Sequence, residues 1–352
     1  METEKLSDKY KKSDSIGSGD SIGEKSDLNI TPAQGNNGGI NSPKNSASSF
    51  NSFRSSYVKP SSRETLFKMM VAMTGAGKSF QIIQECLAYA RPNIVTGKKA
   101  RPAFIVHPNV LYEPQYMDTF TNHIRIDQIP RIIKPEVYII LPINPNGSRM
   151  TDLQKRDMII TAVNSLEKVL LVLDDIDDVL KGAKPRDLDK IFVSHRHRSI
   201  DLITTHQFLN PITTEEWGAV KTISLRRKTQ SVSIIEDRVP NAEILYVAEM
   251  IVDEQYFLAT KMFREGRISE SEWKKRKSFF VEVDIRDNLI LGGYSKECFI
   301  RNCKKYLNLK NSRISDFQKI YADNDGKPRY TRLEAIERII QNELWHYYAG
   351  RE

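Results

Sequence analysis

The chain has 352 residues, 39% of them hydrophobic, and a formal net charge of +8. No run approaches the roughly 18 to 20 apolar residues that cross a bilayer, and no basic N-terminal region precedes an apolar one. Cys86, Cys298 and Cys303 form neither a C-x-x-C pair nor a Cys/His set with metal-ligand spacing, which excludes the usual structural zinc sites. We therefore expect a soluble protein of the cytoplasm, with reduced cysteines and without a transmembrane segment.

The first 61 residues differ in composition from the rest of the chain. Ser, Gly, Asn, Lys and Asp dominate them, and they show almost no apolar periodicity. Such a segment cannot bury enough apolar surface to offset its conformational entropy. We predict a disordered arm over residues 1–61, a large α/β domain over 62–300 and a helical, basic extension over 301–352.

Most of the positive charge lies outside this arm, which carries eight Lys and Arg against seven Asp and Glu. Lys and Arg side chains that contact phosphates release counterions and give affinity that does not depend on sequence. A positive body therefore favours a polyanionic partner such as DNA. A solvated basic surface explains the same charge equally well.

Short apolar runs rich in β-branched residues alternate with segments of helical period. This alternation is typical of an α/β fold with a mostly parallel sheet flanked by helices. The predicted strands cover residues 67–73, 103–107, 137–141, 169–173, 202–205, 221–225 and 279–285. The predicted helices cover residues 79–90, 151–166 and 188–196, the second with Thr151 as its N-cap.

The first predicted strand runs into a glycine-rich loop and then directly into a helix. Residues 72–79 read Ala-Met-Thr-Gly-Ala-Gly-Lys-Ser, the pattern of a Walker A phosphate loop with Ala72 where glycine is usual. Glycine lets backbone N–H groups approach phosphate oxygens at the positive end of the helix. Lys78 is expected to reach the β and γ phosphates of ATP, and Ser79 to ligate Mg²⁺. The predicted nucleotide-binding residues are Thr74, Gly75, Ala76, Gly77, Lys78, Ser79 and Phe80.

The fourth predicted strand ends in two acids, as a Walker B motif does. Asp174 is expected to hold Mg²⁺ through its water shell, and Asp175 to polarise the attacking water. Many related sites place Glu at the second position, so the shorter Asp175 leaves its role as base open. Asp177 and Asp178 lie past the strand end, and we expect them to be surface acids that open a helix.

Polar residues also flank the fifth predicted strand. Gln207 follows it at the edge where the nucleotide should lie and is a candidate sensor of the γ phosphate or of the attacking water. His206 and Gln207 could instead only satisfy backbone groups at the strand end. Arg196 and Arg198 precede the strand, and each is either an arginine finger for an adjacent subunit or a solvated or phosphate-binding arginine.

Taken in this order, the three motifs in residues 64–228 resemble the FtsK-HerA superfamily of P-loop ATPases. Within it they are most similar to viral genome-packaging ATPases, with the Zot-like phage assembly ATPases as a neighbouring branch. The resemblance implies a RecA/FtsK-like fold with ATP and Mg²⁺ as ligands. It also implies a ring, usually a hexamer, that pumps DNA through a central channel, with the arginine finger supplied between subunits.

Zot-like members commonly carry a transmembrane segment, so the resemblance favours a packaging motor in the host cytoplasm or associated with the virion. The N-terminal arm is then a candidate for docking to a portal or capsid vertex. Two other functions fit a phosphate loop: a regulatory NTPase that switches a protein partner, and a nucleotide-binding structural component without turnover.

Two further segments are candidates for DNA contact. Residues 112–134 include His123, Arg125 and Arg131 among aromatic residues, which ordinary packing could equally explain. Residues 273–277, Trp-Lys-Lys-Arg-Lys, place an aromatic ring beside four cations, the composition of a nucleic-acid site or of a solvated helix face.

Overall fold

The computed structural model describes residues 65–95, 97–131, 134–181 and 185–350. The chain divides into two units, Met1–Val58 and Lys59–Glu352, and the description below concerns the second. The arm expected over residues 1–61 lies outside the described residues.

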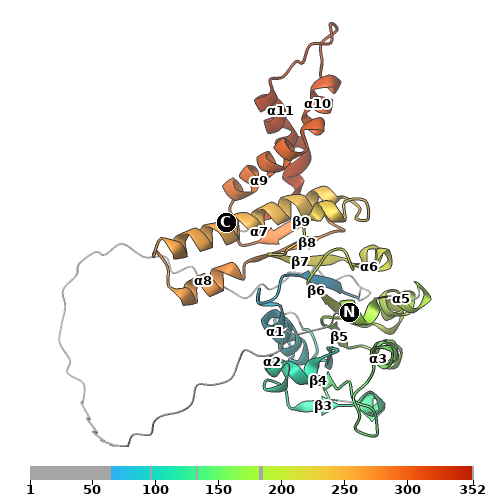
Figure 1. The fold of residues 1–352 in the computed structure, drawn as a ribbon. Helices are drawn as coiled ribbons and strands as arrows, with labels where there is room; N and C mark the ends of the chain where they lie inside the picture. The colour runs from blue at the N-terminus through green and yellow to red at the C-terminus, as the bar shows by residue number, and fades with distance from the viewer. Residues whose placement is uncertain (1–64, 96, 132–133, 182–184, 351–352) are drawn as a thin grey trace, which may run out of the picture. The chain divides into compact units, whose positions relative to one another are not determined.

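One sheet organises this unit. Its strand order is β10-β9-β8-β7-β1-β6-β5-β2-β4-β3 (Figure 1). All neighbouring strands are parallel except β7 with β8 and β8 with β9. The fold is thus α/β with a mostly parallel sheet, as predicted. The strands are β1 (Phe67–Val71), β2 (Ala103–Val106), β3 (Asn122–Ile124), β4 (Val137–Ile140), β5 (Leu170–Leu173), β6 (Asp201–His206), β7 (Thr222–Arg226), β8 (Phe280–Asp284), β9 (Leu289–Gly292) and β10 (Tyr348–Gly350).

All seven predicted strands are present, with ends shifted by two residues or fewer. β3, β9 and β10 were not predicted. Each has only three or four residues, and half or more of those residues are only partly buried. Such short segments lack the continuous apolar run that marks a strand covered on both faces.

Helices cover both faces of the sheet. The α-helices are α1 (Lys78–Ala90), α2 (Pro114–Met117), α3 (Asp152–Ser165), α4 (Asp177–Leu180), α5 (Pro185–Phe192), α6 (Thr214–Ala219), α7 (Ala242–Arg264), α8 (Glu270–Lys277), α9 (Lys296–Leu309), α10 (Asn311–Ile320) and α11 (Arg332–Ile339). Short 3-10 turns cover Val110–Tyr112, Ile126–Arg131, Ser194–Arg198, Val232–Ile234 and Trp345–Tyr347, and a π turn covers Ile340–Leu344.

The core is divided by the sheet into two apolar clusters. Met70 of β1 belongs to the cluster that includes α1 and α2, whereas Met69 and Val71 belong to the cluster that includes α3, α5 and α7. Successive strand side chains point to opposite faces, so both faces of β1 are buried. This burial explains why the central strands read as unbroken apolar runs.

Local signals place several helix ends correctly. Thr151 caps α3, and its side chain and Gln154 form a capping box. The helix predicted over residues 188–196 is shifted: α5 ends at Phe192, and a 3-10 turn follows over Ser194–Arg198.

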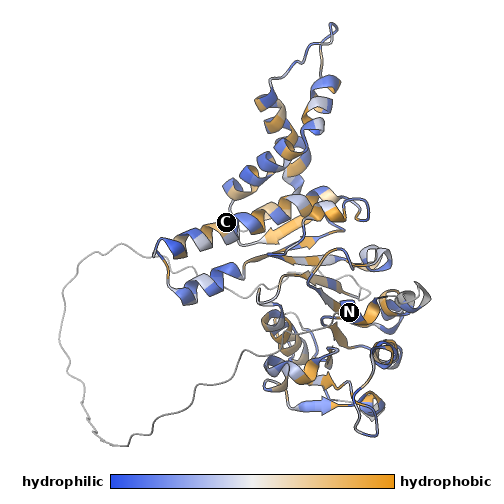
Figure 2. Ribbon diagram, viewed as in Figure 1, coloured by the Kyte–Doolittle hydropathy of each residue, from blue (hydrophilic) through white to orange (hydrophobic). Residues whose placement is uncertain are grey.

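The C-terminal third adds α7 to α11, with polar residues on their outer faces (Figure 2). Ile336, Ile339, Ile340 and Leu344 are buried and form the apolar side of α11 and the π turn after it, whereas Leu333 is 60% exposed. Residue 301, the predicted start of an extension, falls inside α9, and the final strand β10 pairs with β9. The division into domains stays a prediction.

No helix among the described residues is long and apolar enough to cross a membrane.

Candidate nucleotide-binding site

The loop between β1 and α1 has the backbone of an anion cradle. Gly75 and Gly77 adopt φ values of 75° and 85°, which an L side chain rarely tolerates. Ala72 is fully buried and is not among the described residues with positive φ, so its methyl group causes no backbone strain. The first turn of α1 follows at once, and its N–H groups have no partner within the helix. The loop therefore presents donors at a helix N-terminus.

Arg226, the last residue of β7, and Arg227, which follows it, hold this loop in place. The Met73 N–H donates to the Arg227 carbonyl at 2.9 Å, and the Arg226 guanidinium donates to the Ala76 carbonyl at 3.0 Å. Arg226 also donates to Gln81 on α1 at 2.6 Å. Burial lowers the pKa of Arg226 to about 10, against the opposing charge of Glu282. The loop is thus braced from the neighbouring strand.

Lys78, the first residue of α1, faces the acids that follow β5. Burial lowers the pKa of its ammonium group, and the charges of Asp174, Asp175 and Asp177 act in the opposite direction. The structure therefore brings the lysine of the phosphate loop together with the acids of the fourth predicted strand. This pairing is possible because β5 and β1 are both neighbours of β6, so their carboxyl ends meet at one edge.

Asp174 is 4% exposed and is surrounded by hydrogen-bond donors. The Thr205 hydroxyl donates to its Oδ1, and the Tyr116 hydroxyl donates to its Oδ2 at 2.6 Å. His107 Nε2 lies 3.9 Å from Oδ2. Since His107 Nδ1 accepts from the Asn109 N–H at 3.0 Å, a neutral His107 carries its proton on Nε2, toward the carboxylate. The two hydroxyl donors fix the orientation of the carboxylate.

Ser79 and Asp174 are the candidate ligands for Mg²⁺. Ser79 is the second residue of α1, and Asp174 follows β5, whose carboxyl end lies at the same sheet edge as that of β1. The described residues hold no cluster of three or more His, Cys, Asp or Glu side chains suited to a metal. A hydroxyl and a single carboxylate fit Mg²⁺, which usually takes its remaining ligands from water and substrate phosphates.

Asp175, Gln207 and Thr74 form a hydrogen-bonded chain. Thr74 Oγ1 donates to Gln207 Oε1 at 3.0 Å, and Gln207 Nε2 donates to Asp175 Oδ1 at 3.1 Å. Asp175 has a positive φ of 54°, and its N–H donates to Thr205 Oγ1 at 3.0 Å. A left-handed backbone is uncommon outside glycine and costs free energy. The Asp175 side chain is held in this position by its hydrogen bond with Gln207.

His206, the residue before Gln207, lies between two carboxylates. Its Nδ1 is 2.5 Å from Asp177 and its Nε2 is 2.8 Å from Glu216. Burial opposes the imidazolium, but the charge of Glu216 and the hydrogen bond with Asp177 outweigh it and raise the pKa of His206 to about 10. Asp177 opens α4 as expected, yet its side chain is only 16% exposed. The expectation that Asp177 is a surface acid was therefore wrong, because a buried histidine pairs with it.

Arg196 and Arg198 lie away from the phosphate loop of their own chain. Both belong to the 3-10 turn that precedes β6, whereas the phosphate loop follows the parallel strand β1. A six-residue strand separates the two edges by roughly 20 Å. Arg196 donates to the Ala219 carbonyl at 3.1 Å. The structure does not bring either arginine to the site of the same chain, and the role of a finger between subunits stays a prediction.

Phe80 and α7 flank the loop region. The Phe80 side chain is 68% exposed on the first turn of α1.

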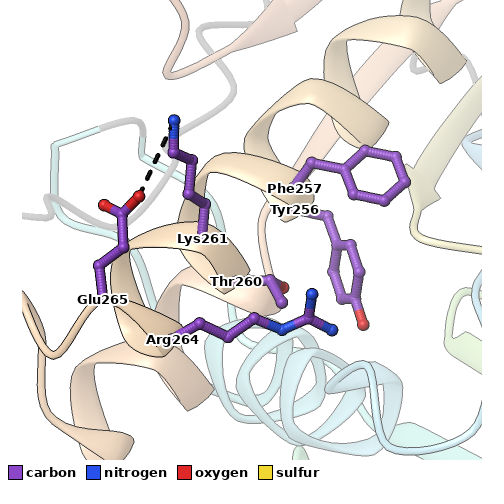
Figure 3. A pocket seen from close by; sticks show the side chains of 6 residues that line it. All are labelled: Tyr256, Phe257, Thr260, Lys261, Arg264 and Glu265. Carbon is purple, nitrogen blue, oxygen red and sulfur yellow. Dashed lines mark ion pairs between the residues drawn. The ribbon is translucent and has the colours of Figure 1, made fainter.

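A hollow of about 670 Å³ lies along α7, where Tyr256 and Arg264 point to one side and Lys261 and Glu265 to the other (Figure 3). Its remaining lining residues are Phe257 and Thr260.

The aromatic residues of this hollow also support the loop. The Arg227 guanidinium lies 5.2 Å from the Tyr256 ring centroid and 5.3 Å from that of Phe257, and it pairs with Asp253. Because the Arg227 carbonyl accepts from Met73, α7 is connected to the phosphate loop through a single residue.

The two segments considered for DNA contact have internal partners. Within residues 112–134, β3 pairs with β4, and Arg125 pairs with Asp127 at 3.0 Å. Trp273 of α8 stacks on Phe263 of α7 with ring centroids 5.0 Å apart, and Lys277 lies over the same indole. These contacts account for Trp273 as part of the packing between α7 and α8. The Arg131 side chain lies outside the described residues.

No protein-family model matches the chain, and no curated protein matches it. Among solved structures, it is similar to the genome packaging NTPase B204 of Sulfolobus turreted icosahedral virus 2 in complex with AMPPCP, with 13% identity and a TM-score of 0.41, over 64% of this chain and 95% of that one. It is also similar to the N-terminal domain of zonular occludens toxin from Neisseria meningitidis, with 15% identity and a TM-score of 0.29, over 46% and 77%. An ATPase from the type III secretion system of pathogenic bacteria matches with 12% identity and a TM-score of 0.31, over 79% and 80%. The first two are proteins of the kinds that the sequence motifs resemble.

Three residues of the site were not predicted from the sequence. His107 and Thr205 end or nearly end predicted strands, so their position at the carboxyl edge was a signal that could have been used. Tyr116 gave no such signal, because it lies in an irregular segment between β2 and β3 and reaches the site only through the packing of α2 against α1.

Proposed function

We propose that this chain binds ATP with Mg²⁺ and hydrolyses it at the loop between β1 and α1. The observation that carries the proposal is the meeting of Lys78 with Asp174 and Asp175, residues almost a hundred positions apart, at the end of a glycine cradle. An ammonium group, two carboxylates and free helix N–H groups at one sheet edge are the parts that phosphoryl transfer requires.

Each residue has a task that follows from its geometry. The backbone of residues 74–79 would bind the phosphates, and Lys78 would neutralise charge on the β and γ phosphates. Ser79 and, through water, Asp174 would hold Mg²⁺, which supplies charge stabilisation when bound.

Asp175 would accept a proton from the attacking water, with Gln207 holding both the acid and Thr74 by hydrogen bonds. The side chain that receives the proton is thus already oriented before a nucleotide binds.

We further propose that hydrolysis drives the movement of DNA by a ring of identical chains. The support is the net charge of +8, most of which lies outside residues 1–61, and the position of Arg196 and Arg198 away from their own phosphate loop. An arginine that cannot reach its own nucleotide remains available to a neighbouring subunit. Docking of the arm to a portal or capsid vertex belongs to the same proposal.

The test is steady-state ATP hydrolysis by the full chain, with and without double-stranded and single-stranded DNA. Lys78→Ala should lower hydrolysis at least about 100-fold, because it removes a fixed charge from the transition state. Lys99→Ala is the matched control, since Lys99 is exposed. The mass of the particle, measured by light scattering with and without nucleotide, reports the ring.

DNA that stimulates hydrolysis several-fold in the wild type and in Lys99→Ala, but not in Lys78→Ala, supports the motor. Hydrolysis that depends on Lys78 but is indifferent to both forms of DNA favours an NTPase that switches a protein partner. Binding of ATP without turnover would instead indicate a structural component.

A further inference from the structure

Tyr116 occupies a position that none of the phosphate-loop motifs accounts for. It belongs to the four-residue helix α2, and its side chain is fully buried. Its hydroxyl donates to Asp174 Oδ2 at 2.6 Å. A tyrosine of the segment between β2 and β3 thus contacts the carboxylate that we assign to Mg²⁺.

The partners of this hydrogen bond are both enclosed by the protein, since Tyr116 is 0% exposed and Asp174 is 4% exposed. The Tyr116 hydroxyl donates to one carboxylate oxygen, and the Thr205 hydroxyl donates to the other. Two hydroxyl groups from different elements, α2 and β6, therefore order the carboxylate that we assign to Mg²⁺.

The hydrogen bond from Tyr116 leaves lone pairs free on the Asp174 carboxylate. Each carboxylate oxygen has two lone pairs, and Asp174 receives one donor on Oδ1 from Thr205 and one on Oδ2 from Tyr116. Both oxygens can still accept from a metal-bound water. Tyr116 can therefore stay in place when the site is loaded, as the outer partners of metal ligands commonly do.

We propose that Tyr116 is a positioning residue that sets the geometry of Asp174 for the divalent ion, and so couples α2 to metal binding. This inference rests on the proposed nucleotide site. Loss of the hydroxyl leaves Oδ2 of the Asp174 carboxylate without its buried donor, so part of the binding free energy of the metal has to reorder the carboxylate.

The experiment compares Tyr116→Phe with the wild type in the full chain. The probe is Mn²⁺, titrated into protein saturated with a non-hydrolysable ATP analogue, with free Mn²⁺ measured by electron paramagnetic resonance. We expect the Kd for Mn²⁺ to rise about 10-fold or more, the usual effect of losing an outer partner. The Kd for the analogue without a divalent ion should stay within about twofold.

The matched control is Tyr138→Phe. Tyr138 is also buried, but it belongs to the apolar cluster on the opposite face of the sheet, and its hydroxyl bonds only weakly to the Lys134 carbonyl, at 3.4 Å. Its Kd for Mn²⁺ should equal that of the wild type. Thermal unfolding of both variants shows whether either substitution acts by destabilising the fold.

An unchanged or lower Kd for Mn²⁺ in Tyr116→Phe overturns the inference. So does an equal weakening of analogue binding with and without Mn²⁺, which would show a purely structural role. If the wild type binds the analogue no better than Lys78→Ala, the proposed function itself fails, and that result is distinct from either of the other two.

Discussion

The carboxyl edge of the central strands and the helices α9 to α11 use polar residues in opposite ways. At the edge, charged and polar side chains are almost fully buried and bond to one another; they include Asp174, Thr204, Thr205, His206 and Glu216. On the C-terminal helices the charges pair at the surface, as Lys304 does with Glu337 at 3.9 Å, where the side chains are 39% and 53% exposed.

This contrast in burial indicates where a functional site lies. Burying a charge costs free energy that a partner only partly returns, whereas exposed pairs contribute little in either direction. A fold does not need a buried histidine between two acids, because apolar residues of similar size often stabilise as well. The buried network at the sheet edge is therefore a candidate functional site, whereas the surface pairs are not.

We expect the greatest loss of ATP hydrolysis from a substitution at Asp175. Asp175→Asn keeps the shape of the side chain but removes the proton acceptor, so ATP hydrolysis should fall by about 10² to 10⁴. Analogue binding should change little, because Asp175 acts on water and not on the phosphates. Single-turnover hydrolysis and fluorescence titration measure the two quantities.

Asp178→Asn serves as the control for this prediction, since Asp178 is an exposed acid three residues further on. Its hydrolysis rate should match that of the wild type. Equal rates in Asp175→Asn and the wild type would remove Asp175 from the reaction and leave the base unassigned.

His206 is expected to affect stability more than any surface charge. His206→Gln leaves Asp177 and Glu216 buried without their cation, which should lower the free energy of unfolding by about 3 to 5 kcal/mol. Urea unfolding followed by circular dichroism measures this change. A loss below about 1 kcal/mol would show that buried His206 contributes no more to stability than the surface pairs do.

The wild type and His206→Gln should also differ in how their free energies of unfolding depend on pH, and the sign of this difference follows from the pKa of His206. The pKa of His206 is raised to about 10 in the folded chain, from an ordinary value of 6.5, and Asp177 and Glu216 are the charged groups that face it. Its stabilising contribution is complete below pH 6.5 and is lost as the pH rises toward 10. The stability difference between the wild type and His206→Gln should therefore shrink over this range, and a difference that grows would contradict the assignment.

The smallest effect is expected at Lys304 on α9. Lys304→Ala should change the free energy of unfolding by less than about 0.5 kcal/mol, because a solvent-exposed pair is screened by water and salt. The measurement is again urea unfolding. A loss of more than about 2 kcal/mol would show that the C-terminal helices depend on their charges after all.

The sequence predicted the parts of this molecule whose signal is local. Residues 170–173 form a run of four fully apolar residues with two acids after it, and glycine at 75 and 77 is required by the backbone of the loop. Each of these features is visible without knowing what lies next to it. The strands and the residues of the loop could therefore be placed before the structure was known.

Features that depend on distant packing could not be predicted. Tyr116 reaches Asp174 across 58 positions, and no periodicity announces it. The helix α7 was not predicted from the sequence, because residues 242–248 bury almost every side chain and this blurs the 3.6-residue period. The pairing of Asp177 with His206 likewise needs the fold, since it joins the ends of two strands.

The position of Arg227 gives the molecule a mechanical property. Its backbone is bonded to the start of the phosphate loop while its side chain rests on α7, a helix of 23 residues that is roughly 34 Å long. A displacement of the start of the loop therefore acts on a residue that packs against α7, and a helix with continuous backbone hydrogen bonds carries such a push as one body. The loop and the outer surface of α7 are thus mechanically joined through Arg227.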